Sequence, residues 1–228
     1  MQLSDLNWMD VESYLEQDDR VILIVGSIEQ HGYLSLASDV RIPEALAAAA
    51  AAREQVLVAP PLNFGISPHF MEFPGTFSLS TETFHQVLYE LVLSLIQHGF
   101  MSILIINGHG GNTYPPQLEA LEREVEDLFI AWYEWFRTPS AAQFAAAEGL
   151  ELAHANWSEA FRFTTVSDLP GGTKDPVNLD NIGTGLSYRD VLGDGSYGGP
   201  YRVEDEIMQR FFNLLVDEVV KILQEMLV

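Results

Sequence analysis

Short apolar runs alternate with helix-forming stretches along this chain, and this alternation constrains its fold more than any other feature. The runs are Val21–Val25, Val56–Ala59, Ser102–Asn107 and Leu128–Trp132. Each is short and apolar, and most are rich in β-branched residues, which is typical of parallel strands buried on both faces. The alternation therefore predicts a layered α/β domain whose strands are joined by right-handed helical crossovers.

The predicted helices have recognisable boundaries and faces. They cover Pro43–Gln55, Thr81–His98, Pro115–Glu126 and Val203–Leu227. The last is amphipathic, with an apolar residue at every fourth position, and we expect that face to pack in the core; an oligomer contact is the alternative. Between Asp168 and Tyr201 the chain is rich in glycine, including Gly183-Thr-Gly185, and we expect a long functional loop there.

Composition excludes several classes of protein. The chain has 228 residues, which predicts one domain over residues 1–228. Its formal net charge of −22 repels phosphate backbones, so nucleic acid is not expected as a partner. No apolar run is long enough to span a membrane, and the first twenty residues do not resemble a secretory signal. Cysteine is absent, which excludes thiolate sites and agrees with a cytoplasmic location.

Two predicted strands end in segments that carry metal-ligand side chains. Glu29, His31 and Asp39 follow the first run, and His109 follows the run that ends at Asn107. Ligands of open α/β sheets bind beyond the carboxyl ends of the strands, where both segments would meet. A lone histidine in a loop more often makes a structural hydrogen bond. Carboxylates and imidazoles that gather in this way indicate a divalent metal site instead.

Four motifs in order resemble those of the creatininase (creatinine amidohydrolase) family. The first is Gly26-Ser-Ile-Glu-Gln-His-Gly32 with Leu34-Ser-Leu-Ala-Ser-Asp39, and the second surrounds the turn Phe73-Pro-Gly-Thr76. The others are Asn107-Gly-His-Gly-Gly-Asn112 and His154-Ala-Asn-Trp-Ser-Glu159. The joint occurrence of the first and third motifs is the specific part of the resemblance, because each motif alone would be weak.

The resemblance implies a three-layer α/β/α sandwich with a mostly parallel central sheet. It also implies two divalent ions (Zn, Mn or Fe), a homo-oligomer, often a hexamer, and hydrolysis of a C–N bond in a small cyclic amide or formamide. Carried over to this chain, it gives one metal to Glu29 and His109, the other to His31, and a bridging role to Asp39. Glu159 would be the remaining metal ligand and would also count among the catalytic residues. His154 would be the proton carrier.

Departures from the family pattern leave other functions open. Gly111 stands where creatininase has a glutamate, the first motif is one residue shorter, and the third motif contains Asn156 and Trp157. A peptidase acting on the terminus of a carrier peptide and a non-catalytic family relative with a structural or binding role are therefore alternatives. His69 and Trp157 are candidates for the substrate pocket; a structural hydrogen bond for His69 and core packing for Trp157 are the competing interpretations.

Overall fold

A parallel sheet of four strands forms the centre of the molecule. The computed structural model of the chain describes residues 1–182 and 185–227. The strands are β1 (Arg20–Val25), β2 (Leu57–Val58), β3 (Ser102–Asn107) and β4 (Phe129–Glu134), in the order β2-β1-β3-β4. β1 and β3 pair in parallel from Arg20↔Ser102 to Val25↔Asn107. Both strands are buried along their whole length, which confirms the expectation of a parallel sheet covered on both faces.

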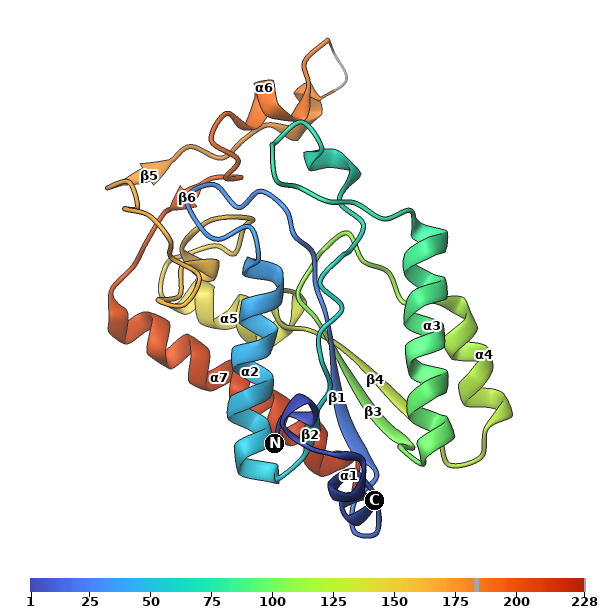
Figure 1. Ribbon diagram of the computed structural model, residues 1–228. Coiled ribbons are helices and arrows are strands. Elements are labelled where there is room, and N and C mark those ends of the chain that lie inside the picture. The colour runs from blue at the N-terminus through green and yellow to red at the C-terminus, as the bar shows by residue number, and fades with distance from the viewer. Residues whose placement is uncertain (183–184, 228) are drawn as a thin grey trace.

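Helices cover the two faces of the sheet and make three layers (Figure 1). One face carries α2 (Ser38–Glu54), α5 (Pro139–Ala147) and α7 (Asp205–Glu225), and the other carries α3 (Thr81–His98) and α4 (Pro116–Glu124). A short helix, α1 (Trp8–Leu15), packs on the second face. The three-layer α/β/α arrangement is therefore confirmed.

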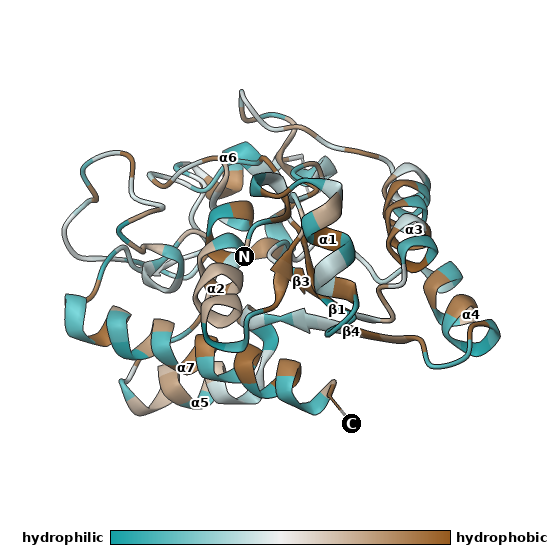
Figure 2. Ribbon diagram, turned by 60° about the horizontal axis from the view of Figure 1, so that its bottom comes forward, coloured by the Kyte–Doolittle hydropathy of each residue, from teal (hydrophilic) through white to brown (hydrophobic). Residues whose placement is uncertain are grey.

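The alternation of side chains along β1 explains why the core has two halves. Ile22 and Ile24 face the cluster formed with α2 and α7, whereas Val21, Leu23 and Val25 face the cluster formed with α3 and α4. In Figure 2 β3 is brown over most of its length, while α7 alternates between teal and brown. Burial of α7 against α2 confirms that this C-terminal amphipathic helix packs in the core.

One predicted helix begins earlier than expected. α2 starts at Ser38, not at Pro43, so Asp39 lies in the first helical turn instead of a loop. Proline lacks the N–H that would bond the carbonyl of Asp39 four residues before it, and the helix passes through Pro43 without that bond. The carbonyl of Asp39 is instead closely approached by Gly26 and Gly108, where an added Cβ would overlap it.

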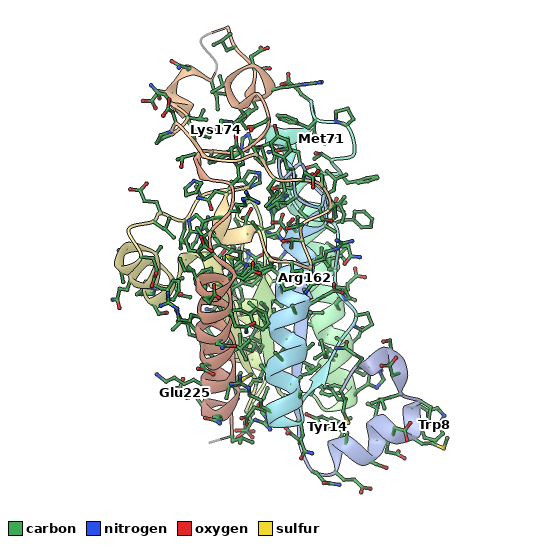
Figure 3. The ribbon with its side chains drawn as sticks, turned by 90° about the vertical axis from the view of Figure 1, so that its left-hand side faces the viewer. Trp8, Tyr14, Met71, Arg162, Lys174 and Glu225 are labelled. Atoms are coloured by element: carbon green, nitrogen blue, oxygen red, sulfur yellow. The ribbon has the colours of Figure 1, made fainter. Side chains whose placement is uncertain are left out.

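The glycine-rich stretch contains only short elements among its described residues. These are β5 (Thr173–Lys174), the 3-10 helix Leu179–Asn181, α6 (Tyr188–Leu192) and β6 (Gly199–Pro200), and β5 pairs with β6 in antiparallel fashion. Gly183 and Thr184 lie outside the described residues. Figure 3 places Lys174, from β5, and Met71 at one end of the molecule, and Trp8 and Tyr14 of α1 at the opposite end.

No helix among the described residues combines the length and the apolar composition needed to cross a bilayer.

Candidate metal centre

Three segments converge beyond the carboxyl ends of β1 and β3. Glu29 and His31 lie on the segment that follows β1, Asp39 lies in the first turn of α2, and His109 lies in the turn after β3. Glu159 comes from the short 3-10 helix Trp157–Glu159. All five residues are at least nine-tenths buried. The structure therefore brings together the five residues that the sequence nominated as ligands.

Asp39 lies between two imidazole rings. Its Oδ1 is 2.9 Å from Nε2 of His31, and its Oδ2 is 3.0 Å from Nδ1 of His109. Glu29 reaches the same side as His109, with Oε1 3.4 Å from Nδ1. Glu159 reaches the other side, with Oε2 3.7 Å from Nε2 of His31. The donors thus form two adjoining groups that share Asp39.

Each histidine is anchored through the ring nitrogen that points away from the carboxylates. Nδ1 of His31 lies 3.1 Å from the carbonyl oxygen of Glu29, and Nε2 of His109 lies 2.8 Å from that of Ile66. A carbonyl only accepts, so these ring nitrogens carry the proton when the imidazoles are neutral. The opposite nitrogens then present lone pairs to the centre, which is the arrangement of metal-binding histidines.

Several buried ligand-type atoms have no hydrogen-bond partner among the described residues. They are Oε2 of Glu29, Nε2 of His31 and Oδ2 of Asp39; the contacts of 2.9 and 3.0 Å that the last two make with Asp39 and His109 lack hydrogen-bond geometry. Leaving such groups unsatisfied in a buried site is costly. The donor set contains only oxygen and imidazole nitrogen, which suits Zn²⁺, Mn²⁺ or Fe²⁺. The residues present therefore fit divalent cations.

The close packing of acids and imidazoles shifts their pKa values in opposite directions. Burial opposes a charge on His31, but Asp39 and Glu159 outweigh it and raise its pKa to about 10. For Asp39, burial is outweighed by the two imidazoles, and its pKa falls well below the usual range. Burial raises the pKa of Glu159 to about 7, against the attraction of His31. The metal-free centre consequently holds extra protons on its histidines, which cations would displace.

His154 lies at the edge of this cluster and, unlike His31, does not carry an extra proton. Its Nε2 is 2.9 Å from the side-chain Nε2 of Gln30 and 3.0 Å from the carbonyl oxygen of the same residue, and its Nδ1 is 3.8 Å from Oε1 of Glu29. The ring stacks on Phe70, with centroids 4.9 Å apart. Burial and the nearby His31 hold its pKa well below the usual value. His154 is therefore a neutral imidazole whose Nδ1 faces the carboxylates.

A cavity of about 410 Å³ opens above the cluster. Its floor includes Glu29, Asp39, His109 and Glu159, and its walls include Phe70, Phe136, Arg137, His154 and Tyr197. This volume suits a small molecule or the end of a peptide.

Comparison with known proteins identifies the family. The family model of creatininase (creatinine amidohydrolase) matches residues 4–223. The chain belongs to the creatininase family. A solved structure named "Creatininase Mn" superposes with a TM-score of 0.83 at 20% identity and covers 98% of this chain and 97% of that one. This likeness shows that the creatininase fold extends over the chain.

Curated relatives of this creatininase-family chain match over shorter segments. A mycofactocin precursor peptide peptidase of Mycolicibacterium smegmatis is 39% identical over 105 residues, which span 40% of this chain and 40% of the relative. A 3-dehydro-scyllo-inosose hydrolase of Thermotoga maritima is 30% identical over 102 residues, 44% of this chain and 33% of the relative. Both alignments span less than half of each protein.

The two pocket candidates have different positions. His69 lines the cavity and lies against Tyr188, with ring centroids 4.7 Å apart. Trp157 is 0% exposed, packs against Phe211 and donates its indole N–H to the carbonyl of Glu151. The pocket interpretation of Trp157 is therefore corrected to core packing, because the 3-10 turn that directs Glu159 inward directs the indole into the core.

Sequence reasoning missed the aromatic and cationic walls of the cavity. Phe70, Phe136 and Tyr197 line it beside Arg137. Phe70 precedes the Phe73-Pro-Gly-Thr76 turn, and that proximity was an available signal. No motif identified Phe136 and Arg137 as lining residues. They follow the end of β4, and the one available signal was that every parallel strand ends at this edge of the sheet.

Proposed function

We propose that this chain is a metal-dependent amidohydrolase that cleaves a C–N bond of a small amide or formamide. The observation that carries the proposal is the position of Asp39, which faces His31 with one oxygen and His109 with the other. Glu29 and His109 would hold one divalent ion, His31 and Glu159 the other, and Asp39 both. Cations bound there would polarise a carbonyl group and acidify a water molecule.

The remaining groups of the chain supply proton transfer and enclosure. The neutral His154 can accept a proton and then donate it to the leaving nitrogen. Phe70 fixes the ring by stacking. The cavity, of about 410 Å³, would hold a small molecule or the few residues of a peptide that reach the centre.

A second candidate is a peptidase that acts on the end of a peptide. The similarity to the mycofactocin precursor peptide peptidase favours it, although that alignment covers 40% of this chain. The same donors would serve either substrate, because an amide and a peptide bond need the same carbonyl polarisation and the same proton for the leaving nitrogen.

Metal analysis and a substrate panel test the proposal together. Protein purified without chelator should contain about two divalent ions per chain. After removal and restoration of Zn, Mn or Fe, it should hydrolyse at least one member of a panel of cyclic amides, formamides and short peptides. His31→Ala should abolish that activity, whereas His98→Ala, which changes an exposed residue at the end of α3, should not. Metal-free protein that folds normally and cannot be loaded would contradict the proposal and favour a binding role.

A further inference from the structure

Arg137 is the one lysine or arginine among the described residues that line the cavity. The chain has only 11 basic residues against 33 acidic ones, so a cation at this position is conspicuous. Arg137 ends the short turn Trp135–Arg137 that follows β4, and its side chain is 56% exposed. The side chain of Arg137 therefore both lines the cavity and is accessible to solvent.

The guanidinium is held in place from three directions. Nη1 donates to both carboxylate oxygens of Glu134, at 3.0 and 3.1 Å, and Nη2 donates to the carbonyl of Gly110 at 3.2 Å. The Phe136 ring lies beneath the guanidinium, whose central carbon is 5.3 Å from the ring centroid. A surface arginine that only pairs with a neighbouring acid needs none of this support.

The same contacts connect Arg137 to the ligand turn. Asn107 and Glu134 are register partners at the ends of β3 and β4, and the Asn107 amide donates to Glu134 at 3.0 Å. The side chain of Asn107 also accepts from the backbone N–H of His109, at 3.1 Å. Gly110, which accepts from Arg137, directly follows His109. The guanidinium is thus hydrogen-bonded to the residue that directly follows the candidate metal ligand His109.

Arg137 keeps unused donors. An arginine has five N–H groups, and Nε has no partner among the described residues. Nη2 makes only the bond to Gly110 and keeps a second N–H. A planar guanidinium with free donors beside a hydrolytic centre suits a carboxylate, which accepts charge-assisted hydrogen bonds in the same geometry.

We propose that Arg137 binds a carboxylate of the substrate, so that the chain selects amides or peptides with a free carboxylate a few bonds from the scissile C–N bond. This inference rests on the proposed function, because it needs a reacting centre at Asp39. Both groups line one cavity of about 410 Å³, so the link between carboxylate and scissile bond is short. Arg137 acts as a specificity residue and takes no part in bond cleavage.

Matched hydroxamates test the inference without knowledge of the natural substrate. The probes are HONH–CO–(CH₂)n–COO⁻ and the corresponding amides HONH–CO–(CH₂)n–CONH₂, with n from one to four. A hydroxamate binds a divalent cation, and the far end reports on Arg137. Calorimetric titration of Mn-loaded protein should show the carboxylate bound about 10-fold more tightly than the amide at one preferred length. Arg137→Gln should abolish this preference, and Arg137→Lys should retain part of it.

The outcomes separate this inference from the proposed function. Arg123→Gln, at an exposed position on α4 outside the cavity, should leave the preference unchanged. Equal binding of acid and amide by the wild-type protein, or a preference that survives in a folded Arg137→Gln variant, would overturn the role of Arg137 alone. Failure of every hydroxamate to bind would instead overturn the metal centre. If Arg137→Gln does not fold, the wild-type comparison and Arg137→Lys decide the question.

Discussion

Nδ1 of His109 lies 3.0 Å from Oδ2 of Asp39, although the two residues come from the turn after β3 and from the first turn of α2. The other oxygen of Asp39 lies 2.9 Å from His31. One carboxylate therefore connects donors from two strand ends. Asp39 can lie between these donors only because α2 begins beside the ends of the two strands. The position of the first turn of α2 therefore determines the geometry of the whole centre.

Asp39→Asn should remove metal from both halves of the centre. The amide keeps the shape of the side chain but loses the negative charge that two cations would share. We expect the metal content measured by elemental analysis to fall from about two ions per chain to less than one. Asp217→Asn, which removes a 67% exposed acid paired with Arg53, is the matched control and should leave metal content unchanged. Full metal occupancy in Asp39→Asn would contradict a bridging role.

Gly108→Ala should damage the centre through the backbone. A Cβ at this position would overlap the carbonyl of Asp39 and lie 2.6 Å from Cγ of Pro43. Neither atom can move without shifting α2. We expect a loss of about 2 kcal/mol or more in the free energy of unfolding, measured by urea denaturation, together with weaker metal binding. Gly171→Ala, with no heavy atom within 4 Å of the added Cβ, should cost little, and similar losses in the two variants would argue against this packing.

The metal-free chain should lose stability as the pH rises above neutrality. The pKa of His31 is raised from 6.5 to about 10 by folding, so the folded state holds an extra proton in that interval. The stabilisation is complete below pH 6.5 and is lost as the pH rises through about 10, with a slope of up to about 1.4 kcal/mol per pH unit. Urea denaturation across this range measures it. His31→Gln should flatten the decline and His98→Gln should not; a stability independent of pH would contradict these charges.

His154→Ala should separate proton transfer from metal binding. His154 could in principle join Glu29 and His31 around a cation, because their donor atoms lie within 4.8 Å of one another. If His154 carries the proton, its removal should lower kcat by about 10²- to 10⁴-fold while the metal content stays at the wild-type value. Loss of a metal ion in the folded variant would instead make His154 a ligand.

Much of the fold was predictable because strand burial leaves a strong pattern. β3 and α3 begin and end at the predicted residues, and the layers follow from apolar runs that alternate with helices. The start of α2 was not predictable, because Pro43 marks a first turn in sequence whereas the helix passes through it. Gly26 and Gly108 pack against the Asp39 carbonyl that Pro43 leaves without a helical donor, and only the tertiary structure shows that contact.

The ligand-type residues were predictable because carboxylates and imidazoles at neighbouring strand ends must lie at one edge of a parallel sheet. The walls of the cavity were harder to find. The position of Arg137 depends on the register of Asn107 with Glu134. This register is a pairing between two strands, and it leaves no local pattern in the sequence. Trp157 was ambiguous for a similar reason, since the direction of its side chain depends on a single 3-10 turn.

Crystallography of Mn-loaded protein with anomalous scattering tests the central claim most directly. We expect two anomalous peaks about 3.5–4 Å apart, one beside His109 and Glu29 and the other beside His31 and Glu159, with Asp39 in contact with both. A single peak that Asp39 does not touch, or no peak in a crystal grown with excess Mn²⁺, would contradict it.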